Sequence, residues 1–330
     1  MKTRMGGYRV LVVTNLWPSK GDPGYGSFVK AQMESLRPLG VEFEVLYIQG
    51  KKSRWNYARA AFDLRRRLKA KPYDLIHAHF GLSGWVARCQ FSIPIVVSFM
   101  GDDVLGRFKR NGHISIYGRF LQASSFVLAR VVSAVIVKSR EMKSKLRLAS
   151  AHVIPNGVDL NLFHPLDQGE SRRTLGLDPC KKFVLFPYNR DEERKRFDLI
   201  EAAVNRGRAD IPELEILHVR GVSGNRMPLY MNAADVLVLA SLAEGSPNAV
   251  KEAMAVNLPV VTVDVGDTAD LIGATEGCYL VPRETEAIAA RIVEVCRRGT
   301  RTRGREWIAR LSMENVASQV VKVYSLVAGR

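Results

Sequence analysis

The chain has 330 residues, of which 47% are apolar, and this length predicts two domains of ordinary size. Its 49 basic and 33 acidic residues give a net charge of +16, which favours partners that carry negative charge. The four cysteines lie far apart and the N-terminal apolar run is too short for a secretory signal, which argues against disulfides and structural zinc. No run approaches the ~18 apolar residues that a membrane span requires.

Short β-branched runs alternate with longer helical patterns along the chain. In the first half, the predicted strands are RVLVVTN, FEVLYIQ, DLIHAHF, IPIVVSFM, SAVIVKS and AHVIPN, and segments such as 26–39 and 53–70 are long enough for crossover helices. In the second half, the predicted strands are KFVLFPYN, LEILHVRG, DVLVLAS, PVVTVDV and CYLVP. Continuous apolar strands separated by helices predict an α/β protein with two doubly wound, Rossmann-like parallel-sheet domains.

The Pro- and Gly-containing segment VIPNGVDLNLFHP marks the predicted join between the domains. We expect an N-terminal domain over residues 1–160, a second domain over 161–311, and a C-terminal helix within 312–330 that packs back towards the first domain. Ser312 is the expected N-cap of this helix, which carries three valines on one face, namely Val316, Val320 and Val323.

The positive charge lies entirely in the first half. Residues 1–160 carry 26 Lys and Arg against 10 Asp and Glu, whereas residues 161–330 carry 23 against 23. The basic residues cluster in two places, Arg59, Arg65, Arg66, Arg67, Lys69 and Lys71 in the first and Arg107, Lys109 and Arg110 in the second. They form either a solvated helix face or a surface that meets anions such as phospholipid head groups, lipid-linked phosphates or nucleic acid. Nucleic acid is disfavoured, because no nucleic-acid-binding motif accompanies the charge.

In open α/β sheets, ligands bind at the carboxyl ends of the strands. The first strand ends in a loop with Gly21, Gly24 and Gly26 before a predicted helix, an arrangement that lets phosphate approach backbone N–H groups. A nicotinamide dinucleotide is disfavoured, because Val29 replaces the third glycine of that fingerprint and the second strand ends in IQG without an acid.

Two further strand ends in the first half carry polar residues. His77 and His79 project to one side of their strand, but a metal site would lack a clear third ligand. We therefore expect a structural role for one histidine and a cleft role for His79. After the next strand, in Gly101-Asp102-Asp103, we expect one carboxylate to cap the loop and the other to contact ligand.

In the second half, Arg190 and Lys195 follow a strand, where a diphosphate would need positive charge. The alternative is a solvated charged turn, in which these bases pair with Asp191, Glu192 and Glu193.

The stretch EGSPNAVKEAMA follows another strand. Ser246 is the predicted N-cap and Pro247 the first residue of a helix whose N–H groups attract an anion. Glu244 precedes this helix and Glu252 lies within it, about 9 Å from Ser246 along the axis. The two carboxylates are therefore expected to reach opposite ends of an extended ligand, with phosphates between them.

Together these motifs resemble the retaining glycosyltransferases of family 4, which have the two-domain GT-B fold with a deep cleft, and in particular the bacterial cell-surface polysaccharide enzymes of the teichuronic acid or capsule kind. The resemblance runs through the glycine loop, DLIHAHF, VVSFMGDDV, VIPNGVDLNLFHP, Arg190 with Lys195, and YMNAADVLVLAS. Its most specific part is the pair of glutamates separated by seven residues in EGSPNAVKEAMA.

The resemblance implies a nucleotide-sugar donor, with UDP or GDP as the nucleotide. Glu244 would contact the donor sugar, Glu252 would bind the ribose, and Arg190 and Lys195 would neutralise the leaving diphosphate without a metal or other cofactor. The remaining donor-site residues would be Gly24, Gly26, Gly245, Ser246, Pro247 and Asn248. Retention would follow from a front-face displacement in which the leaving phosphate takes the acceptor's proton.

One departure from the family is Met100, which stands where many relatives have a histidine. His79, Asp102 or Asp103 would then compensate, or the donor sugar differs. We expect a glycan or lipid-linked acceptor met at the inner face of an anionic membrane, in the cytoplasm, and no nucleic acid partner. The alternatives are an epimerase or phosphorylase of the same fold, an inactive family member, or a non-enzymatic nucleic-acid-binding protein.

Overall fold

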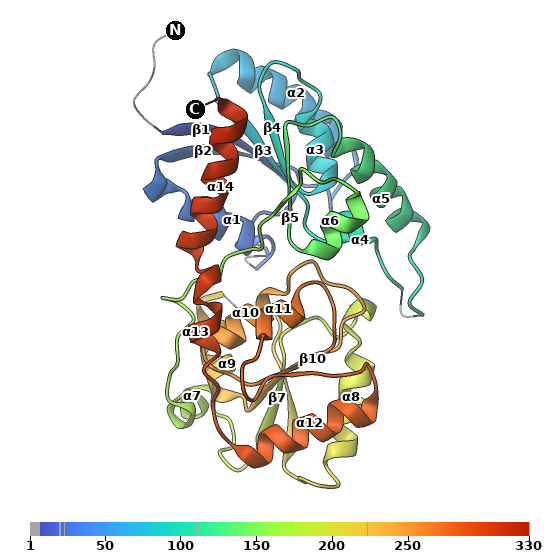
Figure 1. The fold of residues 1–330 in the computed structure, drawn as a ribbon, viewed down its shortest axis with the longest axis vertical. Coiled ribbons are helices and arrows are strands. Elements are labelled where there is room, and N and C mark those ends of the chain that lie inside the picture. Colours follow the sequence, from blue (N-terminus) through green and yellow to red (C-terminus); the bar gives the residue numbers. More distant parts are fainter. Residues whose placement is uncertain (1–6, 20, 23, 110, 223, 330) are drawn as a thin grey trace. The chain divides into compact units, whose positions relative to one another are not determined.

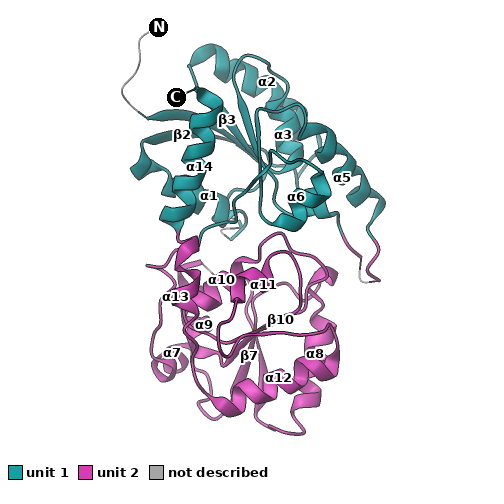
Figure 2. Cartoon of the chain, in the orientation of Figure 1, with its two compact units in different colours: residues 1–107, 114–157, 313–330 teal, residues 108–113, 158–312 magenta. Residues whose placement is uncertain are grey.

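The structure, a computed structural model, describes residues 7–19, 21–22, 24–109, 111–222 and 224–329. Arg110 of the second basic cluster lies outside these residues. The chain forms two compact units, which Figure 2 shows in different colours. The first unit comprises residues 1–107, 114–157 and 313–330, and the second comprises residues 108–113 and 158–312. Within the described ranges, no helix combines the length and the apolar character that crossing a bilayer requires.

The first unit is built on a six-stranded parallel sheet with the order β2-β1-β3-β4-β5-β6 (Figure 1). Its strands are β1 (Tyr8–Thr14), β2 (Val41–Tyr47), β3 (Leu75–His79), β4 (Ile95–Ser98), β5 (Ala134–Val137) and β6 (His152–Val153). Its helices are α1 (Ser27–Ser35), η1 (Arg37–Leu39), α2 (Trp55–Ala70), α3 (Gly81–Ala87), α4 (Asp102–Leu105), α5 (Ile116–Leu128), α6 (Arg140–Leu146) and α14 (Met313–Ala328). All six strands predicted for the first half of the sequence are present.

The C-terminal helix α14 packs on the sheet of the first unit, on the same side as α1. It begins directly after Ser312, and the three valines expected on one face are all buried. Tyr324 of α14 also enters the core, where its hydroxyl lies 2.6 Å from Nδ1 of His77 on β3. The end of the chain therefore completes the core of the first unit.

The second unit has a five-stranded parallel sheet with the order β11-β10-β9-β7-β8. Its strands are β7 (Lys182–Phe186), β8 (Leu214–His218), β9 (Val236–Leu239), β10 (Val260–Thr262) and β11 (Tyr279–Leu280). Its helices are α7 (Gln168–Leu175), η2 (Glu193–Lys195), α8 (Phe197–Gly207), η3 (Gly224–Arg226), α9 (Met227–Ala233), α10 (Asn248–Ala255), α11 (Thr268–Ile272), α12 (Thr285–Arg298), α13 (Gly304–Ile308) and η4 (Ala309–Leu311). The five strands predicted for the second half are also present, so the doubly wound α/β prediction is confirmed.

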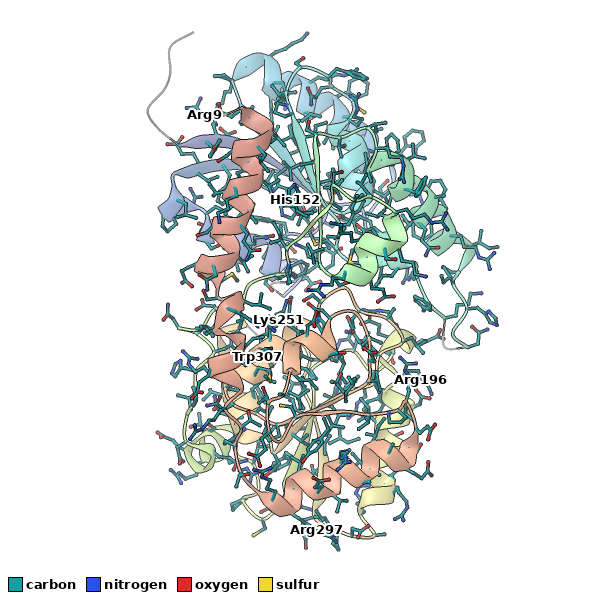
Figure 3. The ribbon with its side chains drawn as sticks, in the orientation of Figure 1. Arg9, His152, Arg196, Lys251, Arg297 and Trp307 are labelled. Atoms are coloured by element: carbon teal, nitrogen blue, oxygen red, sulfur yellow. The ribbon has the colours of Figure 1, made fainter. Side chains whose placement is uncertain are left out.

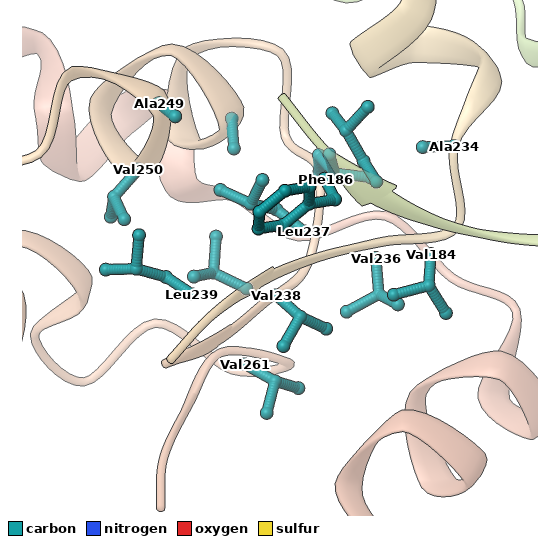
Figure 4. Close-up of a cluster of buried hydrophobic side chains, with 14 of the residues drawn as sticks. Val184, Phe186, Ala234, Val236, Leu237, Val238, Leu239, Ala249, Val250 and Val261 are labelled. Atoms are coloured by element: carbon teal, nitrogen blue, oxygen red, sulfur yellow. The ribbon is translucent and has the colours of Figure 1, made fainter. Parts of the chain in front are cut away.

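Helix α10 is fixed to its sheet by small and branched apolar side chains. Ala249 and Val250 of α10 belong to the same buried cluster as Phe186 of β7 and Leu237 of β9 (Figure 4). Burial of this face holds α10 against β9 and β10. The core thus sets the position of the residues that precede the helix.

Both sheets have the same doubly wound order, in which the first strand of the unit lies between its second and third strands. The chain therefore adds its second strand on one side of the first strand and its third strand on the other side. This reversal creates a switch point between β1 and β3 in the first unit and between β7 and β9 in the second. In sheets of this kind, ligands bind outside the carboxyl ends of the strands at the switch point. The loops after β7 and β9 are therefore where a site is expected in the second unit.

Candidate active site

Glu244 follows β9 and forms the centre of a charged cluster in the second unit. Its Oε1 lies 2.6 Å from Nζ of Lys195 in η2, and its Oε2 lies 3.0 Å from Nη1 of Arg194. The side chains of Glu244 and Lys195 are 9% and 6% exposed, so this is a buried ion pair. The loops after β7 and β9 are thereby joined at the switch point by charge-assisted hydrogen bonds.

The ionisation of Glu244 is controlled by its two cationic neighbours. Burial by itself would raise the pKa of the carboxyl group, but Lys195 and Arg194 together hold the pKa at about 2. Glu244 is therefore negatively charged at neutral pH. A carboxylate held in this way stabilises positive charge beside it and is already committed to two donors.

The two bases predicted after β7 differ in position. Lys195 is buried on Glu244, whereas Arg190 is exposed and its guanidinium lies 4.6 Å from the centre of the Phe197 ring. Arg194, which the sequence analysis did not single out, occupies the second oxygen of Glu244 and also donates to the carbonyl of Ala243. The short η2 turn carries both Arg194 and Lys195. The sequence signal was the run of three basic residues in ERKR.

Part of the charged-turn alternative is also present. Glu192 accepts from Arg194 at 2.6 Å, and Asp191 lies 3.9 Å from Arg220. Glu192 therefore orients one of the cations that contact Glu244. The ion-pair partner of Lys195 is Glu244 itself.

Helix α10 begins one residue later than predicted. The helix starts at Asn248, Pro247 holds the N-cap position with φ −69° and ψ 116°, and no side chain caps the helix. Ser246 is not the N-cap, because its hydroxyl accepts a hydrogen bond of 3.0 Å from Nζ of Lys251 instead. Side chains on a helix point towards its N-terminus, which brings the ammonium of Lys251 back to the loop. Figure 3 labels Lys251 among the side chains of the chain.

One buried lysine and two partly buried carboxyl groups lie near the start of α10. Burial lowers the pKa of Lys251 to about 8, against the attraction of Asp267 and Glu252. Burial raises the pKa of Glu252 to about 7 and that of Asp267 to about 6, in both cases against the attraction of Lys251. Glu252 is thus close to half protonated at neutral pH, and a ligand that favours its carboxylate would change that balance.

Gly266, between β10 and α11, fixes the loop that carries Glu244. Its φ is +62°, and a Cβ atom there would lie 2.6 Å from the carbonyl oxygen of Glu244 and 2.8 Å from that of Gly245. Only glycine allows the two loops to approach this closely. The predicted strand PVVTVDV ends directly before Gly266, for which no role was predicted.

The two glycines predicted to bind donor in the first unit are not equivalent. Gly26 has φ +72°, and a Cβ atom there would lie 2.2 Å from the backbone of Leu16. Gly24 is exposed and has open space around its Cα atom. Gly26 therefore fixes the fold of the loop after β1, while Gly24 leaves the loop surface open.

The two histidines of β3 have different surroundings. His77 bonds both Tyr324 and Ser98, at 2.6 and 2.8 Å, so it has the structural role expected of one member of the pair. His79 is fully buried, and neither of its ring nitrogens has a hydrogen-bond partner in the part of the chain that the structure describes. The next residue, Phe80, has φ 79° and ψ 143°, a strained conformation for a residue with a side chain.

In the loop after β4, Asp103 caps the backbone. Its carboxylate accepts from the N–H groups of Met100, Gly101 and Gly81 at 2.9 to 3.2 Å. Burial raises its pKa to about 6 although these three donors oppose the shift. Asp102 begins α4 and is half-buried, and Gly101 precedes it with φ 136°.

Two parts of the sequence match described families. Residues 4–162 match Glycosyltransferase Family 4, and residues 198–298 match Glycosyl transferases group 1. The first match includes the loops after β1, β3 and β4, and the second includes Glu244, Glu252 and all of α10.

Individual proteins agree with these matches. TuaC of Bacillus subtilis, a glycosyltransferase assigned to teichuronic acid biosynthesis, is 27% identical, and the match covers 86% of this chain and 88% of TuaC. The lipopolysaccharide core biosynthesis mannosyltransferase LpsB of Rhizobium meliloti is 30% identical, covering 63% of this chain and 68% of LpsB.

Solved structures match the fold over almost the whole length. Sucrose-phosphate synthase of Thermosynechococcus elongatus has a TM-score of 0.80 at 20% identity, covering 98% of this chain and all of that one. HepE of Anabaena, solved in complex with UDP-glucose, has a TM-score of 0.67 at 20% identity, covering 96% and 99%. The two parallel sheets are thus those of the GT-B fold.

Proposed function

The chain belongs to glycosyltransferase family 4, and from this premise we propose that it transfers a sugar from a nucleotide diphosphate sugar to a glycan or lipid-linked acceptor in cell-surface polysaccharide biosynthesis. UDP and GDP are the nucleotides we propose. The names of TuaC and LpsB support the polysaccharide assignment.

One observation carries the proposal, namely the buried carboxylate of Glu244 held by Lys195 and Arg194 at the switch point of the second sheet. Sugar transfer passes through a transition state with positive charge at the anomeric carbon. A fixed carboxylate stabilises such charge most strongly where water is excluded. We assign Glu244 to the donor sugar, and its low pKa keeps it ionised for this role.

The leaving diphosphate requires positive charge, which Lys195 and Arg194 supply beside the start of α10. Helix N-termini carry partial positive charge and donate backbone N–H groups, so we assign the diphosphate to Gly245, Ser246 and Asn248. A bound diphosphate would compete with Glu244 for Lys195. We propose that this exchange needs no metal, because the cations and the helix already provide the charge.

We assign Glu252 to the nucleotide ribose, whose hydroxyls donate to a carboxylate. Glu252 lies within α10, four residues after the helix begins at Asn248 and eight residues beyond Glu244 in the sequence. Because burial holds the pKa of Glu252 at about 7, ribose binding is expected to favour its ionised form and to lower that pKa.

We further propose that transfer proceeds with retention, through front-face displacement in which the leaving phosphate accepts the proton of the acceptor hydroxyl. The commitment of Glu244 to two cations supports this mechanism, because each carboxylate oxygen already has a donor and is thereby a poor nucleophile. We propose the cytoplasmic face of an anionic membrane as the place of reaction, supported by the excess of positive charge in residues 1–160.

The first test is a thermal-shift screen with UDP, GDP, ADP and their sugars, followed by incubation of the stabilising nucleotide sugar with and without acceptor. Transfer with retained anomeric configuration supports the proposal. Isomerised sugar would instead indicate an epimerase, and sugar released onto added phosphate would indicate a phosphorylase.

Two pairs of variants connect the activity to the site. Glu244→Gln preserves shape and should abolish transfer, whereas Glu276→Gln, on an exposed glutamate of the same unit, should not change it. Lys195→Met and Arg194→Met should weaken nucleoside diphosphate binding, and Arg190→Met measures whether the exposed arginine also contributes. Full activity of Glu244→Gln would remove the assignment.

A further inference from the structure

Helices α2, α3 and α5 of the first unit enclose an open groove with a volume of about 940 Å³. Its walls are mainly apolar and aromatic side chains, including Tyr57, Ala61, Leu82, Trp85, Tyr117 and Phe120. Of the described residues that line it, Arg54 alone carries a charge. Grooves of this size accommodate drug-sized ligands, and none of the donor-site residues lies in it.

The groove offers mainly hydrocarbon to a ligand and few hydrogen-bonding groups. The indole N–H of Trp85 donates to Ser124 at 2.6 Å, so it is satisfied within the wall. The thiol of Cys89 donates to the carbonyl of Trp85. Apart from Arg54 and the hydroxyls of Tyr57 and Tyr117, little in the groove could replace the hydrogen bonds that a nucleotide or a sugar makes with water. A hydrocarbon chain makes no such bonds to lose.

The apolar character continues outside the groove. Trp55 and Phe62 of α2 are 78% and 73% exposed, and Ile116 of α5 is 88% exposed. Trp55, Ala58 and Phe62 share one face of α2, and Ile116, Phe120 and Val127 share one face of α5. A soluble helix normally directs such a stripe into the core, so outward stripes on two helices beside one groove indicate an interaction surface.

Positive charge surrounds this surface. Helix α2 carries five basic residues and one acid, Asp63, which pairs with Arg66 at 3.0 Å. Two more arginines lie against exposed aromatic rings near the groove, Arg88 at 3.8 Å from the centre of Phe91 and Arg130 at 3.4 Å from that of Phe126. Aromatic rings next to cationic groups suit the boundary between lipid tails and head groups.

We propose that this groove binds an acyl chain of an anionic phospholipid, and that the surrounding stripes insert into the bilayer while the arginines contact lipid phosphates. Charge complementarity selects this occupant, because a second copy of the chain would bring two basic surfaces together. The inference rests on the proposed function, because a membrane-bound acceptor is the reason why the enzyme would bind a membrane. It adds that attachment depends on apolar insertion as well as on charge.

The test is co-sedimentation of the full chain with vesicles of phosphatidylcholine, with and without phosphatidylglycerol, in the absence of any acceptor. The wild type should bind the anionic vesicles, and part of this binding should remain at high salt. Phe62→Ser/Phe120→Ser should weaken binding about tenfold or more, because both side chains are exposed in the free protein and lose burial in the bilayer. Arg65→Glu/Arg66→Glu should weaken it mainly at low salt.

Leu280→Ser, at an exposed position of the second unit, is the matched control and should bind within roughly twofold of the wild type. Lipids brominated on the acyl chain should quench the fluorescence of Trp55 and Trp85, and Trp55→Phe should remove part of that quenching.

Three outcomes overturn the inference. The wild type does not bind vesicles, or Phe62→Ser/Phe120→Ser binds them within roughly twofold of the wild type. The third is that the wild type forms a dimer but binds no vesicles, and that Phe62→Ser/Phe120→Ser is a monomer. The nucleotide thermal shift is measured on the same samples. A protein that binds vesicles but no nucleotide contradicts the proposed function alone, and one that binds nucleotide but no vesicle contradicts this inference alone.

Discussion

The two units share one strand order but distribute charge and apolar surface in opposite ways. In the second unit, Lys195, Glu244 and Lys251 are buried together beside the ends of β7 and β9. In the first unit most of the charge lies outside, on α2 and its neighbours, although Asp103 and Lys138 are buried. The large exposed apolar side chains of the described residues also belong to the first unit, with the exceptions of Leu166, Leu280 and Trp307.

This difference shows how one topology serves two kinds of contact. The second unit has a buried cluster of paired charges at the loops after β7 and β9, where we propose that the donor binds. The first unit has a broad basic and apolar surface suited to an extended partner. The sheets do not differ in kind, so the loops and the outer helix faces determine what each unit binds.

Of the substitutions that test this difference between the units, Glu244→Ala is expected to have the largest effect on the free energy of unfolding. The substitution leaves Lys195 buried without its partner, and breaking a buried pair in this way costs about 3–5 kcal/mol of unfolding free energy. Chemical denaturation measures the loss, and Glu244→Leu/Lys195→Met should recover part of it. Arg65→Ala/Arg66→Ala, on the exposed face of α2, should change stability by about 0.5 kcal/mol or less. If Glu244→Ala and Arg65→Ala/Arg66→Ala lowered the free energy of unfolding equally, the proposed difference between buried and exposed charge would be wrong.

A second effect separates the glycines of the loop after β1. Gly26→Ala should destabilise the first unit by about 2 kcal/mol or more, because it adds a Cβ to a left-handed residue packed against the backbone of Leu16. Gly24→Ala, with open space around it, is the control and should be almost neutral. Denaturation midpoints measure the stability of both variants. Similar losses of stability for Gly26→Ala and Gly24→Ala would mean that Gly26 does not fix the loop.

The sequence predicted the sheets well because continuous β-branched runs are a local signal. All of the strands were found, and the helix that carries Glu252 was placed to within one residue. Ser246 was wrong as the N-cap because the reach of Lys251 depends on how α10 packs, which no local pattern states. Arg194 and Gly266 were missed for the same reason, since each acts on a loop distant in sequence.

The groove was missed for a different reason. The segment IYGRFLQASSFVL reads as an ordinary amphipathic helix with arginine on its outer side. Only the tertiary arrangement shows that Ile116 and Phe120 lie outside while Leu121 and Leu128 fill the core. Likewise, nothing in DLIHAHF distinguishes His77, which bonds α14, from His79, because the partner of His77 comes from the other end of the chain.

A third, smaller effect tests how α14 is attached to the rest of the first unit. Tyr324→Phe removes the bond to Nδ1 of His77 and leaves that nitrogen buried, which should cost about 2 kcal/mol. Tyr8→Phe, which removes a half-buried bond to Ser325, is the control and should cost less. If the two variants lose equal stability in denaturation experiments, the buried bond contributes no more than its half-buried neighbour.

The smallest effect concerns Glu252 and has the opposite sign. Burial raises its pKa from 4.5 to about 7, so between these values the folded protein binds a proton that the unfolded chain does not. Stability from this group is therefore fully present below about pH 4.5 and is lost as the pH rises through about 7. At about pH 8, Glu252→Gln removes a buried charge and should stabilise the free protein by about 1 kcal/mol, with little change at about pH 4.

The same substitution should weaken binding of the nucleotide sugar about tenfold, because the neutral amide replaces the carboxylate that we assign to the ribose. The wild type should bind the donor more tightly as the pH rises through about 7, and Glu252→Gln should lose this dependence. Calorimetric titrations at the two ends of that range, paired with denaturation midpoints, measure both effects. A variant that is more stable at high pH and binds donor normally would leave Glu252 as a buried acid without a ligand, and the ribose would then require another partner in the second unit.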